Sequence, residues 1–405
     1  MKPEPWYNIP NLNITEKHAI IIGGGLAGTS AAYSLVRKGW KVTLIERERE
    51  LATGASGNLA GIIAPMITHN NDPIGKFYLR GFEYSLAHLQ ELENHISFNN
   101  CGVIELGTGK ANKDLSNIII PSADITKLSQ EEASHLAGIK LQTNGLHIAK
   151  AGLVNPADLC RANILTCGNN IKVIFSKDIL SLEKDEYIWS AIDGFGNKIA
   201  SAPVVIIANA ADAMHISQAS WVPLHKVRGQ LTHLPSTALN LKTILCYDGG
   251  YISPEVNGFN YIGATYSRDN LNADVTIEDH IENITNLKKV IDIGDINYEE
   301  LSGRVSFRAS VPDRRPVIGA VPDIDAFYYD YADLKHGRNK KYPDGKYLQG
   351  LYISTGHGSR GLTSCPIGGE LLASMINNEE LPVPAGINNI LSPARFVIKN
   401  LKGRK

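Results

Sequence analysis

Residues 18–48, HAIIIGGGLAGTSAAYSLVRKGWKVTLIERE, decide the fold of this chain. The apolar run Ala19 to Ile22 predicts a short strand of the kind that is buried on both faces in a parallel sheet. A glycine-rich turn follows, and Ala27 to Lys38 predict a helix that stops at Gly39. Val42 to Ile45 predict a second strand. The order strand, turn, helix, strand therefore predicts an α/β fold that starts with a βαβ unit.

The turn of this unit carries a GxGxxG pattern formed by Gly23, Gly25 and Gly28. Gly23 permits the tight turn, Gly25 lets the backbone approach a pyrophosphate, and Gly28 lets the helix pack closely on the strand. The helix N-terminus then offers N–H groups to the phosphates. Glu46 follows Gly28 by 18 residues, where a carboxylate can accept hydrogen bonds from ribose hydroxyls. These features predict a Rossmann-like site for a dinucleotide and do not separate FAD from NAD.

The composition is that of a globular protein. The 405 residues carry a net charge of −1, and 43% of them are hydrophobic. No apolar run approaches the roughly 20 residues of a membrane helix, and the N-terminus lacks the apolar core of a secretory signal. We therefore expect a cytoplasmic protein with reduced thiols and neither a membrane span nor a metal site. The five cysteines form no CxxC pair: Cys101, Cys160, Cys167, Cys246 and Cys365.

The second half of the chain changes pattern after about residue 216. Residues 226–235, 242–256 and 260–267 predict alternating, turn-punctuated strands of a mixed or antiparallel sheet. Residues 350–376 return to a buried strand, a glycine-rich turn and a helix. We therefore expect a Rossmann-like domain of the FAD-binding type, with a substrate domain inserted into it. The predicted cofactor domain is 18–98, 146–214 and 302–392, the substrate domain is 99–145 and 215–301, residues 1–17 are linker-like, and 393–405 are a basic tail.

Three features together resemble a known family: the βαβ start, the segment GASGN (54–58) and GHGSRG (356–361) between a strand and a helix. They are similar to the FAD-dependent amine oxidases related to D-amino-acid and glycine oxidases, and GASGN decides for FAD over NAD. Further segments, including RVSFRASVPDRRPVIGAVPD (304–323) and SPARFVIKNLKGRK (392–405), resemble the FAD-dependent half of bifunctional tRNA 5-methylaminomethyl-2-thiouridine biosynthesis proteins. The resemblance covers nearly the whole chain.

The resemblance implies a defined reaction. The expected activity is FAD-dependent oxidative removal of the carboxymethyl group from 5-carboxymethylaminomethyl-(2-thio)uridine at the wobble position of tRNA. The products would be 5-aminomethyl-(2-thio)uridine and glyoxylate. The methyltransferase half of that family does not match this chain, so we expect a separate methyltransferase as a partner. Two alternatives stay open: an oxidase of glycine, sarcosine or D-amino acids, and a non-catalytic flavin-binding subunit.

Three residues are candidates for catalytic roles. Arg308 matches the arginine that pairs with the substrate carboxylate, although a surface ion pair is the alternative for such a residue. Tyr251 stands where relatives place a tyrosine over the substrate, or it is a half-buried sheet residue. His357 lies in the turn expected at the flavin pyrimidine edge, where it would add positive charge or a hydrogen bond, or it is an ordinary turn residue.

The predicted cofactor contacts come from five segments of the chain. Ala210 stands where the family commonly has glycine, and Cys365 does not match the cysteine that links flavin covalently in some relatives, so we expect non-covalent FAD. No metal ligand is expected. The predicted set is Gly23, Gly25, Leu26, Ala27, Gly28, Glu46, Arg47, Gly54, Ala55, Ser56, Gly57, Asn58, Ala208, Asn209, Gly358, Ser359, Arg360 and Gly361.

Two basic clusters are candidates for contact with tRNA phosphates. Residues 335–346 carry Lys335, Arg338, Lys340, Lys341 and Lys346, but this segment matches the family poorly. The tail 393–405 carries Lys402, Arg404 and Lys405 and belongs to a matching segment. The resemblance therefore favours the tail as a phosphate-binding element.

Overall fold

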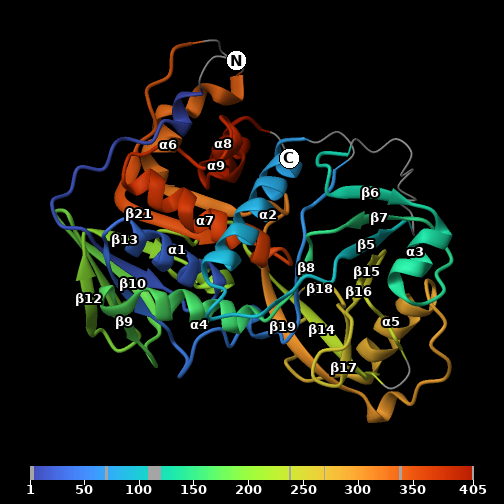
Figure 1. Ribbon diagram of the computed structural model, residues 1–405. Coiled ribbons are helices and arrows are strands. Elements are labelled where there is room, and N and C mark those ends of the chain that lie inside the picture. The colour runs from blue at the N-terminus through green and yellow to red at the C-terminus, as the bar shows by residue number, and fades with distance from the viewer. Residues whose placement is uncertain are drawn as a thin grey trace. The chain divides into compact units, whose positions relative to one another are not determined.

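The computed structural model describes residues 4–68, 72–107, 120–236, 239–268, 270–336 and 340–403 (Figure 1). Contacts divide the chain into two compact units. The first contains residues 1–56, 159–225 and 309–405, and the second contains residues 57–158 and 226–308. This division is based on chain contacts and not on a cofactor, so the predicted domain assignments stay predictions. In the described part of the chain, no helix is long and apolar enough to cross a membrane.

The first unit is built on a six-stranded sheet in the order β20-β21-β13-β1-β2-β9 (Figure 1). The predicted strands at 19–22 and 42–45 are present as β1 His18–Ile22 and β2 Lys41–Ile45. They pair in parallel with each other, with β13 Val204–Ile207 and with β9 Ile171–Ile174. β21 Tyr347–Thr355 extends the parallel set, and β20 Val317–Pro322 closes that edge antiparallel. The prediction of an α/β, Rossmann-like domain is confirmed.

Two long helices pack against each other in this unit. α1 Leu26–Arg37 and α7 Gly361–Ile376 approach so closely that a Cβ on Gly369 would lie 2.5 Å from the Ser30 carbonyl oxygen. The unit also holds an antiparallel three-stranded sheet, whose strands are β10 Ile179–Asp185, β11 Ile188–Asp193 and β12 Lys198–Ala202. Apolar residues of both sheets, including Ile20 and Trp189, share one buried core.

The C-terminal segment packs with the N-terminus instead of forming a loose tail. Buried residues of α9 Ala394–Leu401 share a cluster with Trp6, and α6 Ile324–Asp330 supplies Phe327 to the same cluster. Lys402 of the predicted basic tail lies 4.5 Å above the Trp6 ring and pairs with Glu4 at 3.3 Å. Lys402, which is predicted to bind phosphate, therefore already has an acidic partner. Arg338, Arg404 and Lys405 of the two basic clusters lie outside the described residues.

The second unit is built on a nine-stranded mixed sheet, in which eight strands follow the order β18-β14-β17-β16-β15-β5-β7-β6 and β19 pairs with β14. In this sheet β15 pairs in parallel with β5. The pairs β14–β17, β14–β18, β15–β16, β16–β17, β5–β7 and β6–β7 are antiparallel. The prediction of a mixed sheet is confirmed. The strand bounds are β5 Val103–Leu106, β6 Ile125–Leu128, β7 Gly145–Ile148, β14 His225–Pro235, β15 Ile244–Tyr247, β16 Gly250–Ile252, β17 Phe259–Gly263, β18 Ser267–Arg268 and β19 Ser302–Ser310.

Helices α3 Gln130–Ala137 and α5 Ile277–Lys288 pack their apolar faces on this sheet. α3 starts with a capping box in which Ser129 and Glu132 satisfy each other's backbone N–H groups, as the sequence SQEE indicates. α2 Pro73–Glu91 starts after Asp72, whose Oδ1 accepts a hydrogen bond from Gly75 N at 2.9 Å. The remaining elements are α4 Pro156–Thr166, α8 Ile387–Leu391, and a small sheet of β3 Gly61–Ile63, β8 Gly152–Val154 and β4 Phe98–Asn99.

The α1–α7 contact predicts opposite effects for two adjacent glycines of α7. In Gly369→Ala the new methyl group would meet backbone atoms of Ser30 and Ala31, so we expect a loss of about 1–3 kcal/mol in the free energy of unfolding. In the matched control Gly368→Ala it would meet the end of the Ile318 side chain at 3.0 Å and would be in ordinary contact with His357 Cε1 at 3.7 Å, and alanine favours the helix. Urea unfolding of both variants measures the difference, and equal stabilities would contradict the contact.

Candidate functional site

The turn between β1 and α1 has no room for side chains. Gly23 has φ of +108°, and a Cβ there would lie 2.6 Å from the Ala208 carbonyl oxygen. A Cβ on Gly28 would lie 1.9 Å from the Gly23 carbonyl oxygen. The turn is therefore lined by backbone alone, and the first N–H groups of α1 have no acceptor within the helix. This is the arrangement in which a helix N-terminus binds a pyrophosphate.

Two side-chain oxygens lie at the amides of this turn. Glu46 Oε2 accepts a hydrogen bond from Gly24 N at 2.6 Å, while its Oε1 accepts one from Glu48 N at 2.9 Å. Ser56 Oγ accepts from Leu26 N, the first residue of α1, at 3.1 Å. The Glu46 carboxylate is therefore fixed beside the glycine turn, and Ser56 demonstrates that an oxygen fits at the helix N-terminus. The cofactor contacts predicted for Glu46 and Ser56 stay predictions.

Asn209 and Ala210 continue the site after β13. Asn209 Oδ1 is buried and has no hydrogen-bond partner among the described residues. A buried acceptor of this kind needs a donor from outside the chain, and a ribose hydroxyl or a flavin N–H group is such a donor. Ala210 has φ of +54°, so it adopts the left-handed conformation for which relatives use glycine, and its carbonyl accepts from Thr355 Oγ1 at 2.7 Å. The alanine departure thus leaves the turn conformation intact.

Three further predicted cofactor contacts, Arg47, Gly54 and Asn58, have different surroundings. The half-exposed Arg47 side chain pairs with Asp212 at 2.6 Å, so it already has an acidic partner within the first unit. A Cβ on Gly54 would meet no atom within 4 Å, which leaves room for a group other than protein there. In the second unit, Asn58 Oδ1 accepts a hydrogen bond from Arg304 Nη1 at 2.8 Å. The cofactor roles of Arg47, Gly54 and Asn58 stay predictions.

A second glycine-rich turn leads from β21 into α7. Gly356 and Gly358 have φ of +70° and +58°, and Gly358 N donates to the Ala309 carbonyl at 2.9 Å. Arg360 is the N-cap residue of α7. Cys365 is buried in α7, and burial raises the pKa of its thiol well above the usual value, which disfavours the thiolate needed for a covalent bond to flavin. Non-covalent FAD stays a prediction.

His357 lies inside this turn as a neutral ring. Ser364 Oγ donates to the Arg360 carbonyl at 2.9 Å, so it accepts from His357 Nδ1 at 2.8 Å. His357 Nε2, at 3.1 Å, then accepts from Ser354 Oγ. Burial lowers the pKa of His357 to about 4. At neutral pH this residue therefore holds the turn by hydrogen bonds and supplies no positive charge.

Arg308, on β19 of the second unit, has an unusual environment for a largely buried cation. Its guanidinium lies over Gly229 of β14, where a Cβ would come within 2.5 Å of Nη1. Nη1 donates to the Thr265 carbonyl at 3.3 Å. No acidic residue in the described part of the second unit forms an ion pair with it, and burial lowers its pKa. Arg308 therefore presents unused donors of a rigid, charged fork.

Two other buried arginines show what a structural arginine looks like in this chain. Arg228 pairs with Asp279 and donates to the carbonyls of Asn272 at 2.6 Å and Asp274 at 2.8 Å. Arg395 binds both oxygens of Asp313, at 2.8 and 3.1 Å. Each of these charges is neutralised by a carboxylate, as burial normally requires. Among the described residues of the second unit, Arg308 has no such carboxylate, which makes it the strongest candidate for binding an external carboxylate.

Tyr251 shares the neighbourhood of Arg308. It lies on β16 opposite Cys246 and Gly263, and its hydroxyl is 3.5 Å from the Ala60 carbonyl oxygen, at the long limit of a hydrogen bond. Burial raises the pKa of Tyr251 to about 12, and the positive charge of Arg308 partly opposes this rise. The phenol is thus a proton donor at neutral pH. The structure therefore brings together Arg308 and Tyr251 of the predicted catalytic set.

Sequence analysis did not select Gly229, Thr265 or Arg304. Gly229 supports the Arg308 guanidinium, Thr265 orients it through a backbone carbonyl, and Arg304 holds Asn58. Gly229 could have been selected from the sequence, because it lies in the middle of the predicted strand 226–235, and an interior strand glycine often marks a close approach by another group. The other two contacts join residues far apart in the sequence and carry no local pattern.

Comparisons with known proteins agree with this geometry. The family described as FAD dependent oxidoreductase (DAO) matches residues 18–375. The chain belongs to this family, and it is a FAD-dependent oxidoreductase, as its sequence predicts. The solved glycine oxidase of Geobacillus kaustophilus shares the fold with a TM-score of 0.74 at 19% identity, covering 93% of this chain and 98% of that one. The solved iminodiacetate oxidase of Chelativorans sp. BNC1 shares the fold with a TM-score of 0.70 at 23% identity. The match covers 93% of this chain and 98% of that one.

The curated relatives narrow the resemblance further. The chain is 34% identical over 98% of its length to the tRNA 5-methylaminomethyl-2-thiouridine biosynthesis bifunctional protein MnmC of Pseudomonas putida. It is 32% identical over 99% of its length to the protein of the same name from Stutzerimonas stutzeri. The chain spans 62% of the length of each of these relatives. The predicted resemblance to the FAD-dependent part of these proteins is confirmed.

His357 predicts a specific pH dependence of stability. Between pH 6.5 and about 4 the unfolded chain binds a proton that the folded ring excludes, so the free energy of unfolding falls as the pH falls through this window. The slope from one such group is at most about 1.4 kcal/mol per pH unit. In His357→Gln, which keeps a neutral polar side chain, we expect the slope measured by urea unfolding to be shallower by up to that amount.

NMR of protein with nitrogen-15 in its histidines supplies the control for this prediction. The signals missing from His357→Gln identify the ring, which should show a proton on Nδ1 and no titration between pH 8 and 5.5. A ring that titrates near pH 6.5 would contradict the neutral assignment.

Proposed function

We propose that this protein oxidises the carboxymethylamino group of 5-carboxymethylaminomethyl-(2-thio)uridine at the wobble position of tRNA. The support is the similarity to MnmC proteins over nearly the whole chain, together with family membership. The products are 5-aminomethyl-(2-thio)uridine and glyoxylate. A bifunctional relative's name ends at the methylaminomethyl form, so a primary amine still lacks one methyl group, and we propose that a methyltransferase consumes this product.

The chemistry takes place on an N-substituted glycine arm, R–NH–CH2–COO−. FAD, when bound, would supply a two-electron acceptor for the hydride of the CH2 carbon. With loss of the amine proton the arm would become the imine R–N=CH–COO−. Water adds to the imine carbon and the C–N bond breaks, which releases R–NH2 and glyoxylate. Two electrons leave the substrate, and the oxygen of glyoxylate comes from water. The protein must hold the carboxylate, orient the CH2 group and keep the amine unprotonated.

The unpaired Arg308 is the observation that carries this proposal. A carboxylate accepts two parallel hydrogen bonds from a guanidinium, and low solvent access strengthens the pair. Gly229 and Thr265 fix one side of the fork, so the remaining donors face one direction. Tyr251 adds a hydroxyl that stays protonated at neutral pH and can donate to the same carboxylate. This geometry fits a substrate whose reactive arm ends in COO−.

The residues of the first unit fit FAD. The backbone turn at Gly23–Gly28 would bind its pyrophosphate, the fixed Glu46 carboxylate would accept from the ribose, and the unsatisfied Asn209 Oδ1 would accept from the cofactor. The turn at 356–361, held by the neutral His357, would present backbone N–H groups to the flavin ring. These roles follow from the local chemistry of each residue.

The direct test is mass spectrometry of wobble nucleosides after incubation of the holoprotein with tRNA that carries the carboxymethylaminomethyl group. We expect loss of this nucleoside and gain of the aminomethyl form. A protein that leaves the tRNA unchanged but steadily oxidises glycine, sarcosine or a D-amino acid would instead be a small-molecule oxidase. Flavin that none of these substrates reduces under anaerobic conditions would identify a non-catalytic subunit.

Arg308→Ala should abolish flavin reduction by the modified substrate while FAD stays bound, because the variant loses only the carboxylate contact. Arg308→Lys keeps the charge but not the fork, so we expect an intermediate rate with a raised KM. Anaerobic stopped-flow measurement of flavin bleaching reports the rate, and the absorbance of the purified protein reports FAD content. Retained reduction in Arg308→Ala would remove this residue from the substrate site.

Gly229→Ala tests how Arg308 is positioned. The new methyl group would overlap the guanidinium, so the fork must shift, and we expect at least about a tenfold rise in KM with FAD content unchanged. Gly194→Ala is a matched control, because its Cβ would meet only the end of the Leu180 side chain at 3.1 Å. An unchanged KM in Gly229→Ala would show that the support by this glycine is unimportant.

A further inference from the structure

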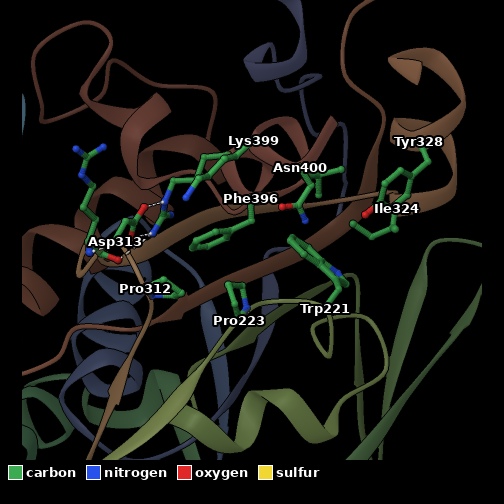
Figure 2. A pocket seen from close by; sticks show the side chains of 12 residues that line it. Trp221, Pro223, Pro312, Asp313, Ile324, Tyr328, Phe396, Lys399 and Asn400 are labelled. Atoms are coloured by element: carbon green, nitrogen blue, oxygen red, sulfur yellow. Dashed lines mark hydrogen bonds and ion pairs between the residues drawn. The ribbon is translucent and has the colours of Figure 1, made fainter. Parts of the chain in front are cut away.

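A groove in the first unit shares no residue with the predicted cofactor and substrate sites. It has a volume of about 370 Å³ and is formed by α9, by the segment around Asp313, by α6 and by residues 221–223 (Figure 2). This volume is within the range of roughly 300–1,000 Å³ that ligand pockets occupy. The groove is therefore large enough to hold one nucleotide.

Aromatic side chains line one part of the groove. Figure 2 shows Phe396 in the middle, Trp221 beside it, and Tyr328 with Ile324 at the end opposite Asp313. Trp221 is held in place because its Nε1 donates to the Gln218 carbonyl at 2.9 Å, while the Tyr328 side chain is 47% exposed. Phe396 is largely buried, so the aromatic faces accessible in the groove are those of Tyr328 and, in part, Trp221.

The charged lining of the groove is positive. Arg395 and Asp313 neutralise each other in a bidentate ion pair. Arg315 and Lys399 remain, and in the described part of the first unit neither forms an ion pair with an acidic residue. Lys399 and its neighbour Asn400 are exposed on α9, so their side-chain donors are accessible to a ligand.

We propose that this groove binds a single-stranded segment of the tRNA substrate, outside the wobble nucleotide; this inference rests on the proposed function. Bases stack on aromatic faces such as those of Tyr328 and Trp221, and each stacked base contributes about 1–3 kcal/mol. The cations Arg315 and Lys399 pair with backbone phosphates, and the Asn400 amide can bind a base edge or a 2′-hydroxyl. An acidic peptide would use the two cations but would have no use for flat aromatic surfaces. The basic tail predicted from sequence thus contributes through the exposed side of α9 and not through its buried residues.

The test measures binding of fluorescently labelled, unmodified tRNA to the FAD-bound protein at several salt concentrations. Lys399→Glu and Arg315→Glu should each weaken binding about tenfold and reduce the slope of log K against log salt by roughly 0.7–0.9 per lost contact. Tyr328→Ala should weaken binding by a similar factor without changing the slope, because stacking releases no counterion. Lys140→Glu, at an exposed position of the second unit, is the charge-matched control and should leave binding unchanged.

Each outcome decides the inference separately from the proposed function. In all groove variants the free modified nucleoside should still reduce the flavin at the rate of the wild type, because the substituted residues belong to neither predicted site. Unchanged affinity and salt slope in Lys399→Glu and Arg315→Glu, or a wild type that binds no tRNA, would overturn the groove. Binding of uridine monophosphate by a protein that does not bind tRNA would also overturn the groove. A wild type that binds tRNA through the groove but is reduced by neither nucleoside nor modified tRNA would overturn the proposed reaction and leave the groove standing.

Discussion

The position of α1 depends on one contact that excludes every side chain. A Cβ on Gly28 would lie 1.9 Å from the Gly23 carbonyl oxygen, so the helix can approach β1 only because residue 28 is glycine. This approach directs the N-terminus of α1 and the carboxylate of Glu46 to the same turn. It also sets the line along which α7 crosses α1 at Gly369. The remaining parts of the cofactor site are attached to these two helices and to the strands beside them.

The second unit contains a largely buried cation, Arg308. Buried arginines in this chain are normally neutralised, as Arg228 is by Asp279 and Arg395 is by Asp313. Arg308 is partly desolvated and has no acidic partner among the described residues of the second unit, and desolvation of a cation costs free energy. A substrate carboxylate would recover it at the moment of binding. The same charge that makes Arg308 unfavourable in the unliganded chain thus provides selectivity for a substrate that ends in COO−.

The sequence predicted what local patterns determine. The βαβ start, the capped α3 and the alternating strands of the second unit follow from glycine spacing, a capping box and period-two hydrophobicity. The candidate site was predictable through the family resemblance, which supplied Arg308 and Tyr251. The support of Arg308 by Gly229 and the pairing of Arg304 with Asn58 were not predictable, because they join residues that are distant in sequence. The packing of the basic tail was also missed, since the apolar side of α9 is interrupted by Arg395, which becomes buried only through Asp313.

The central claim is that one chain removes a carboxymethyl group by a two-electron oxidation. A single anaerobic turnover with tRNA that carries 5-carboxymethylaminomethyluridine tests this most directly, when reduced flavin, glyoxylate and 5-aminomethyluridine are measured in the same sample. The account predicts the three in a ratio of one to one to one, with water as the source of the new glyoxylate oxygen in oxygen-18-labelled water. Flavin that stays oxidised, or flavin that is reduced without release of glyoxylate, would contradict it.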